Sequence, residues 1–164
     1  MKQLISGLWL TCICLVGKGQ ADSKPLYLQF PDIPPFTLTK VPDSSSFGKA
    51  ALVKKKPVLI IYFSPDCDHC QQTTRQLIAK IDAFKNIQVI MASPLSYALI
   101  ADFYTKYAIA SYPNIVMGHD EKFFLGSFYR ISEYPTMFLY NKKGRFIKKL
   151  EGSIELQQVA DAFK

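Results

Sequence analysis

Apolar and polar residues alternate along the chain in two different periods. Residues 58–63 (Val-Leu-Ile-Ile-Tyr-Phe) form an unbroken apolar run, which predicts a strand buried on both faces of a sheet. From Cys70 to Phe84, apolar residues recur at spacings of three and four, which predicts a helix with one face toward the core. A buried strand followed by an amphipathic helix is typical of an α/β fold.

The rest of the chain continues this alternation of strands and helices. The predicted elements are, in chain order, a strand at 87–92, a helix at 95–107, a short strand at 115–117, a helix capped by Asp120 that runs to Tyr129, strands at 136–140 and 146–150, and a closing helix at 154–163. Helices placed between strands indicate a mixed sheet flanked by helices.

The first 21 residues have the pattern of an export signal. Lys2 precedes a mostly apolar run at residues 4–16, and Gly19 and Ala21 then stand at the −3 and −1 positions of a cleavage after Ala21. The apolar run is shorter than the roughly 20 residues that span a bilayer. We therefore predict a signal peptide at residues 1–21 and a periplasmic or other extracytoplasmic location, with an uncleaved anchor as the alternative.

Length and composition are those of one globular domain. The chain has 164 residues, 49% of them hydrophobic and 20% charged, which excludes a disordered chain of low hydrophobicity. Beyond residue 21, 18 of the 20 basic residues remain with all 13 acidic residues, a formal charge of +5. The cations are spread out, with small clusters at 54–56 and 142–149, and without a matching motif they predict no nucleic-acid binding. We divide the exported chain into an N-terminal extension at 22–50 and a folded domain at 51–164.

Two of the four cysteines lie in the predicted signal peptide, so the exported chain keeps only Cys67 and Cys70. They stand in the segment 65–70 (Pro-Asp-Cys-Asp-His-Cys), between the buried strand and the predicted helix. Unpaired N–H groups and the helix dipole stabilise an anion in such a first turn. Cys67 is therefore expected to be the partly exposed thiolate, and the shielded Cys70 to resolve a mixed disulfide formed on Cys67.

Two structural interpretations compete with redox chemistry at this pair. An inert disulfide that closes so short a loop restrains the unfolded chain little. A zinc site needs four ligands, and His69 and His119 are the only histidines, with no second Cys-x-x-Cys or His pair. We therefore favour a redox-active Cys67–Cys70 disulfide and predict no metal or other cofactor.

Three segments carry a resemblance to the thioredoxin superfamily. They are residues 35–39, residues 56–70, and residues 129–136 (Tyr-Arg-Ile-Ser-Glu-Tyr-Pro-Thr). Over about residues 33–164 the chain is most similar to exported TlpA/ResA-like thiol–disulfide oxidoreductases. The resemblance implies a thioredoxin fold with a βα insertion before the strand that follows the cis-proline, and residues 112–126 would partly supply that insertion.

The resemblance also implies a site and an activity. Pro135 takes the place of a cis-proline beside the disulfide, and Tyr134 and Thr136 are expected to flank a groove for the substrate peptide. The implied enzyme exchanges disulfides with protein substrates through Cys67 and Cys70. We interpret it as a reductase, which in an oxidising compartment must be recharged by a membrane electron carrier, with a disulfide oxidant or isomerase as the alternative.

Several positions depart from the family pattern. Asp66 replaces the aromatic residue before the first cysteine, and Ile61 stands where thioredoxin has a buried acid. Thr73 stands where many TlpA/ResA-like proteins carry an acid. The group that takes the proton from Cys70 is therefore not identified.

Asp68 and His69 replace the Gly-Pro of thioredoxin between the cysteines. A histidine in this position is shared with disulfide isomerases and strong oxidants. A protonated His69 favours a thiolate on Cys67, whereas Asp66 and Asp68 oppose it, so we expect both intervening residues to modulate the site. A surface histidine with no role is the alternative.

Two other activities share parts of this pattern. The segment 64–67 matches the end of the peroxiredoxin motif, but Ile60 stands where that motif has proline, and the nearby Cys70 gives little reason to invoke peroxide. Copper carriers of this fold resemble a Cys-x-x-x-Cys with a distant histidine. His119 suits that role, but the cysteine spacing here is one residue short.

Overall fold

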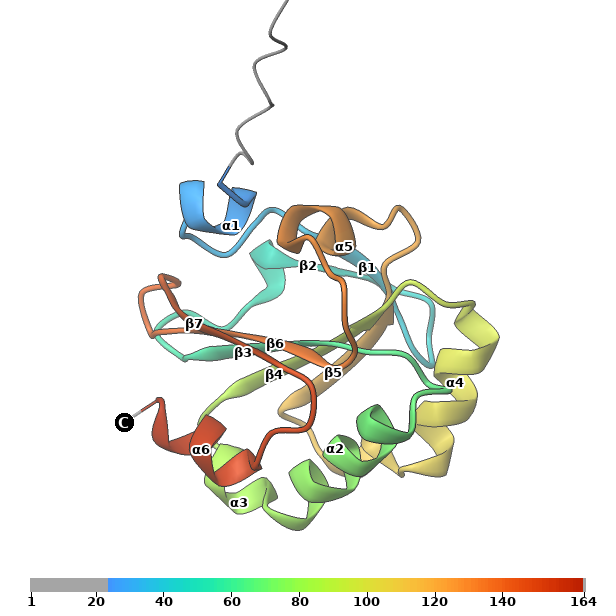
Figure 1. Ribbon diagram of the computed structural model, residues 1–164. Coiled ribbons are helices and arrows are strands. Elements are labelled where there is room, and N and C mark those ends of the chain that lie inside the picture. The colour runs from blue at the N-terminus through green and yellow to red at the C-terminus, as the bar shows by residue number, and fades with distance from the viewer. Residues whose placement is uncertain (1–23, 164) are drawn as a thin grey trace, which may run out of the picture.

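The computed structural model describes residues 24–163, and the predicted signal peptide lies outside this range (Figure 1). Its centre is a seven-stranded mixed sheet in the order β2-β1-β5-β4-β3-β6-β7. The strands are β1 (Thr37–Lys40), β2 (Ser46–Gly48), β3 (Val58–Tyr62), β4 (Gln88–Ser93), β5 (Ile115–His119), β6 (Thr136–Tyr140) and β7 (Phe146–Glu151). The helices are α1 (Leu26–Gln29), α2 (Asp68–Ala79), α3 (Ile81–Phe84), α4 (Tyr97–Lys106), α5 (Phe124–Tyr129) and α6 (Leu156–Asp161), with 3-10 turns η1 (Lys49–Ala51) and η2 (Ile109–Ser111).

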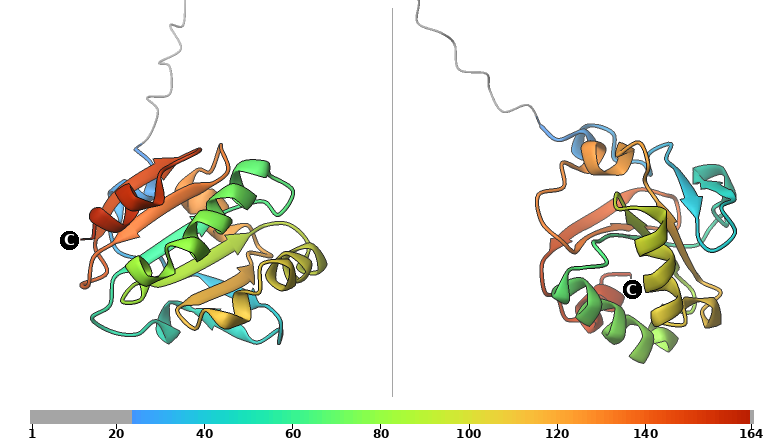
Figure 2. Two further views of the ribbon diagram at one scale, coloured as in Figure 1. Left: turned by 90° about the horizontal axis from the view of Figure 1, so that it is seen from below. Right: turned by 90° about the vertical axis from the view of Figure 1, so that its right-hand side faces the viewer.

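Strand β3 lies inside the sheet, parallel to β4 and antiparallel to β6. Strand β5 continues the parallel part beyond β4, whereas β7 and the pair β1–β2 are antiparallel additions at the two ends. Helices α2, α3, α4 and α6 cover one face of the sheet, and α1 and α5 cover the other (Figures 1 and 2). This arrangement confirms the predicted fold class.

The unbroken apolar run of β3 follows from this position. Leu59 and Ile61 point into a core that contains α2, α4 and α6 residues, and Ile60 and Tyr62 point into a second core beneath α1 and α5. Every residue of the strand is at most 2% exposed. Successive strand residues face opposite sides, so a central strand covered on both sides must be apolar throughout.

The helix after the cysteines differs from its prediction. The apolar spacing predicts one helix through Phe84, but the structure divides it into α2 and α3 at Lys80, whose φ of −112° and ψ of 23° are not helical. Phe84 is nevertheless completely buried in the core. The three- and four-residue spacing therefore identifies the buried face correctly but does not detect the change of helix direction.

The N-terminal segment is part of the same sheet. Strand β1 pairs with β5, and the ring of Tyr27 on α1 packs against Tyr129, Phe138 and Phe146. The division at residue 50 into an extension and a domain stays a prediction. All seven of these strands and both cores lie within residues 24–163, so a chain that begins at Asp22 keeps all the packing contacts among these residues. No helix in this range is long and apolar enough to cross a bilayer.

Candidate functional site

The two cysteines lie at the junction between the end of β3 and the start of α2. Cys67 is the N-cap of α2, with φ −88° and ψ 120°, and its Sγ accepts a hydrogen bond from the backbone N–H of Cys70 at 3.4 Å. The first N–H groups of a helix have no partner within the helix, and together with the helix dipole they favour negative charge at this position. The half-buried Cys67 sulfur therefore lies at the positive end of α2.

Cys70 lies one helical turn further on and faces the core. Its side chain is 1% exposed, and both cysteines are free thiols in the structure. Burial raises the pKa of the Cys70 thiol well above its usual range, although a backbone hydrogen bond with Ser64 opposes the shift. The pair thus combines an accessible sulfur at a helix N-terminus with a buried, protonated thiol behind it.

The second part of the site is the segment before β6. The Tyr134–Pro135 peptide bond is cis, and the Sγ of Cys67 donates to the carbonyl oxygen of Tyr134 at 3.7 Å. The hydroxyl of Thr136 donates to the carbonyl of Glu133 at 2.6 Å, and the Pro135 carbonyl accepts from the N–H of Gly152 at 2.9 Å. The structure therefore brings the Tyr134–Thr136 segment and the dithiol together, and the role of this segment as a substrate groove stays a prediction.

An aromatic contact with β3 packs against the Tyr134–Thr136 segment. The ring of Tyr134 stacks on Tyr62, with centroids 6.0 Å apart and an interplanar angle of 17°. The hydroxyl of Tyr62 donates to Asp120 Oδ2 at 3.0 Å. Burial raises the pKa of Tyr62, so this phenol stays a donor. The sequence identifies Tyr62 only as a strand residue, because its partners lie 58 and more positions away.

The two residues between the cysteines are exposed. His69 Nδ1 lies 2.9 Å from the hydroxyl oxygen of Ser153, in the loop between β7 and α6. This contact spans 84 positions of the sequence, and no local pattern predicts it. Asp68 lies in the first turn of α2, where a carboxylate is favoured by the helix dipole. The structure thus gives His69 a partner away from the cysteines.

The proton acceptor for Cys70 remains unassigned in the described part of the chain. Thr73 is buried but carries no acid. Asp120 is the only buried carboxyl group among residues 24–163, and it binds Tyr62 in the second core, whereas Cys70 belongs to the first. Asp120 therefore lies on the other side of the sheet from the thiol.

The structure does not gather a metal-binding set at the dithiol. Within the described residues, no three His, Cys, Asp or Glu side chains are grouped so that they could hold an ion. His119 ends β5, paired with Ser93 of β4 and Thr39 of β1, and β4 separates its strand from β3. The geometry therefore gives no support to the copper-carrier alternative.

The fold and the site together define a thioredoxin-type protein: a Cys-x-x-Cys pair at a helix N-terminus faces a cis-proline segment. A model of the thioredoxin-like domain family matches residues 48–164, so the chain belongs to that family. With its dithiol intact, it is a thiol–disulfide oxidoreductase. A search among curated proteins gives no match.

Solved structures agree on the fold. A secreted disulfide oxidoreductase of Mycobacterium tuberculosis, described as homologous to E. coli DsbE, aligns with a TM-score of 0.66 and 17% identity over 78% of this chain and 93% of its own. StoA from Bacillus subtilis aligns with a TM-score of 0.62 and 19% identity over 80% and 98%. A putative thioredoxin from Neisseria meningitidis aligns with a TM-score of 0.64 and 23% identity over 79% and 87%.

Proposed function

We propose that this chain works outside the cytoplasm and reduces disulfide bonds in exported proteins. The observation that carries the proposal is the asymmetry of the two thiols. Cys67 is accessible at the start of α2 and Cys70 is buried beneath it. This is the arrangement that an attacking and a resolving thiol require.

The reaction proceeds by two exchanges. The Cys67 thiolate attacks one sulfur of the substrate disulfide, a Cys67–substrate bond forms, and the other substrate sulfur leaves as a thiolate. Cys70 then loses its proton and attacks the Sγ of Cys67, which releases the second substrate thiolate and forms the Cys67–Cys70 disulfide. Two electrons pass to the substrate, whose thiolates take up two protons. A membrane electron carrier returns two electrons and two protons to the chain.

The segment 134–136 orients the incoming polypeptide. The carbonyl of Tyr134 already contacts the attacking sulfur, and its ring is held by Tyr62. An extended substrate segment beside Tyr134, Pro135 and Thr136 places its disulfide over Cys67. The exposed His69 and Asp68 then lie at the entrance, beside the attacking sulfur.

Export of the chain and the direction of its redox reaction are argued from different observations. The pattern of residues 1–21 is that of a signal peptide, and the similar Mycobacterium tuberculosis protein is described as secreted. Direction is a matter of reduction potential. A dithiol potential at or below about −270 mV supports a reductase, and one near about −120 mV marks an oxidant.

The activity is tested by insulin reduction with dithiothreitol. The chain from Asp22 accelerates this reduction, and its Cys67→Ser variant does not, because the attacking sulfur is gone. Equal rates of insulin reduction by the two proteins would contradict the proposed activity. Equilibrium with a glutathione buffer then gives the reduction potential and decides between reductase and oxidant.

The roles of the two thiols are tested by trapping. A Cys70→Ala variant, expressed in its native compartment and acid-quenched, retains its substrate or electron donor as a disulfide on Cys67, because no resolving thiol remains. The matched Cys67→Ala variant traps little, because Cys70 is buried. Equal trapping by both variants contradicts the assignment of roles, and the adduct itself identifies the partner.

A further inference from the structure

A wide groove lies at the end of the sheet opposite the dithiol. It has a volume of about 970 Å³ and is bounded by the segment 33–37, residues 46–56 around η1, the start of β3 at Val58, and the β6–β7 turn at 142–144. Strand β3 has five residues, so its other end at Tyr62 lies about 13 Å from Val58 at the rise of a strand, and the dithiol follows that end. The left side of Figure 1 shows this end of the sheet, where the turn between β6 and β7 approaches the start of β3.

The charged side chains that line this groove are all basic. Six of the chain's 20 basic residues line it and none of its 13 acidic residues does; the six are Lys49, Lys54, Lys55, Lys56, Lys142 and Lys143. Lys49 donates to the carbonyl of Ile33. None of the six is in an ion pair with a carboxylate of residues 24–163. The groove is therefore an uncompensated positive surface.

The turn that carries three of these lysines is also unusual in its backbone. Lys55 has a φ of 63°, in the left-handed region that glycine and asparagine prefer. A lysine at such a position gives up backbone stability relative to glycine, and the exposed turn offers it no packing in return. The turn thus holds Lys54, Lys55 and Lys56 exposed along the groove.

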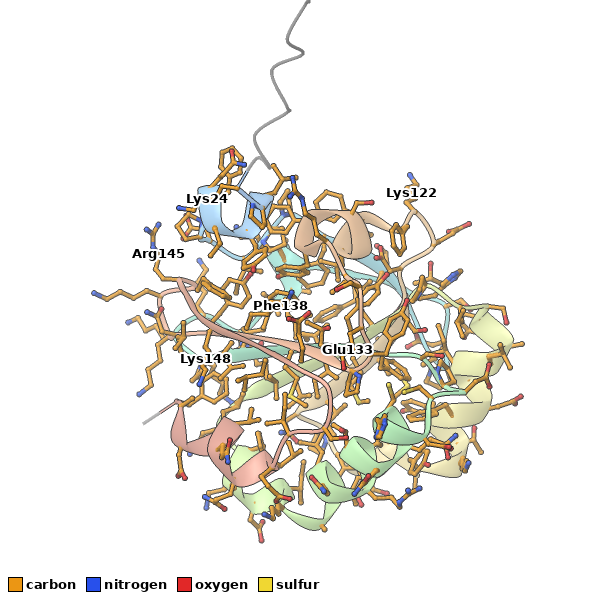
Figure 3. The ribbon with its side chains drawn as sticks, viewed as in Figure 1. Lys24, Lys122, Glu133, Phe138, Arg145 and Lys148 are labelled. Atoms are coloured by element: carbon orange, nitrogen blue, oxygen red, sulfur yellow. The ribbon has the colours of Figure 1, made fainter. Side chains whose placement is uncertain are left out.

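Apolar side chains accompany the cations on this side of the molecule. Val53, between the lysines, is 55% exposed, and Leu26 and Phe30, at the two ends of the α1 region, are 42% and 61% exposed. The α1 region adjoins the β6–β7 hairpin, because Pro31 accepts a hydrogen bond from the N–H of Phe146. Figure 3 shows Lys24, at the start of this region, and Arg145, in the hairpin, on the same side of the molecule.

We propose that this surface docks the protein on an anionic lipid bilayer. Lysines interspersed with exposed apolar side chains match the headgroup boundary, where cations meet anionic lipid and apolar groups enter the acyl region. An acidic protein partner would explain the lysines but not the exposed Val53, Leu26 and Phe30.

Docking by this surface leaves the redox site free. The groove is at the start of β3 and Cys67 follows its end, so a bilayer against the lysines lies at the opposite end of the sheet from the attacking sulfur. An enzyme held in this way keeps its dithiol toward soluble substrates. The proposal concerns binding and does not depend on the direction of the redox reaction.

The test is co-sedimentation of the chain from Asp22 with vesicles. Binding is compared for vesicles of phosphatidylcholine alone and of phosphatidylcholine with phosphatidylglycerol. We expect binding only to the anionic vesicles, weakened by salt. A Lys54→Gln/Lys55→Gln/Lys142→Gln variant is expected to bind on the order of 100-fold more weakly, since each lysine near an anionic surface contributes about fivefold.

The matched control is Lys80→Gln/Lys85→Gln/Lys122→Gln, which removes the same charge from residues outside the groove. It keeps the affinity of the unaltered chain if the groove is the binding surface. Equal losses in the two variants, or no binding to anionic vesicles, overturn the proposal. Binding of polyglutamate but not of vesicles also overturns it, in favour of an acidic protein partner.

Two further readouts separate this proposal from the proposed function. Both triple variants retain insulin reduction in solution, because neither touches the dithiol. Cys67 of vesicle-bound protein remains open to alkylation at the rate of the free protein. Protection of Cys67 on vesicles would place the dithiol at the bilayer and contradict the proposed orientation.

Discussion

At the scale of single residues, the two cysteines show how one helical turn creates two different chemistries. Cys67 is the N-cap of the helix and its sulfur accepts the N–H of Cys70, whereas the Cys70 side chain lies inside the first turn and is 1% exposed. Helical geometry places residues three apart on the same face. The sulfur of Cys70 therefore lies behind that of Cys67, where burial raises its pKa.

We predict that the reduced chain from Asp22 reacts with a bulky maleimide at Cys67 alone near neutral pH. Alkylation of the Cys67→Ala variant is expected to be more than about tenfold slower, because Cys70 is both inaccessible and protonated. Mass spectrometry of the adducts over time measures the two rates. In guanidinium chloride both cysteines should react alike, and a native Cys70 as fast as Cys67 would contradict the predicted asymmetry.

At the scale of elements, α5 depends on one side chain. It has six residues, fewer than a helix needs to be stable alone, and the preceding Phe123 has a φ of 51°. The backbone N–H groups of Phe124, Leu125 and Gly126 all donate to the carboxyl group of Asp120, at 3.0, 2.9 and 3.3 Å. Asp120, predicted to cap this helix, lies three residues before the N-cap Phe123, and its carboxyl group joins the start of α5 to Tyr62 of β3.

We predict that Asp120→Ala lowers the free energy of unfolding by about 2–4 kcal/mol, since it leaves three helix donors and a buried phenol without an acceptor. Tyr62→Phe removes one hydrogen bond and is expected to cost about 1 kcal/mol. Urea unfolding measures both values. The double variant should lose less than the sum, because both substitutions remove the same hydrogen bond; strict additivity would show that the bond contributes nothing.

At the scale of the whole molecule, both cores hold weak acids in their neutral form. Burial raises the pKa of the Cys70 thiol and of the phenols of Tyr62, Tyr129 and Tyr140. Tyr129 and Tyr140 share a hydrogen bond of 2.7 Å within the second core. The folded protein therefore keeps protons that the unfolded chain releases in alkali.

We predict that the contribution of these four groups to stability is fully present below about pH 8 and is lost as pH rises. The unfolded chain releases the thiol proton near about pH 8.5 and the phenol protons near about pH 10, while the folded protein keeps them, so alkali favours unfolding. Each group contributes a slope of about 1.4 kcal/mol per pH unit once its unfolded form is ionised. Urea midpoints measured from neutral pH to about pH 10.5 give this dependence.

Two controls belong to this measurement. Tyr140→Phe removes one titrating phenol, so the slope of stability against pH above about pH 10 should decrease by the contribution of one group. Oxidation to the Cys67–Cys70 disulfide removes the thiol and should abolish the decline that begins near about pH 8.5. A stability that is unchanged up to about pH 10.5 would contradict the proposed burial of these acids.

Sequence patterns predicted the elements correctly wherever the interactions that determine an element are local. The run at 58–63 and the hairpin strands 136–140 and 146–150 are present as predicted, and Asp120 accepts from the first N–H groups of α5, although that helix begins at Phe124 with Phe123 as its N-cap. In each case, burial or pairing involves residues only a few positions apart or repeats with the period of the element. The place of the cysteine pair between strand and helix follows from the same periodicities.

Only the tertiary structure decided which distant faces meet. It stacks Tyr134 on Tyr62, joins His69 to Ser153, and brings the lysine cluster at 54–56 to the turn at 142–144. Periodicity records which face of an element is apolar, but not which other element covers it, because that depends on strand order and on where each crossover returns. The sequence by itself therefore determined the dithiol and its local geometry, and the packing of the sheet determined what surrounds the dithiol and what lies at its opposite end.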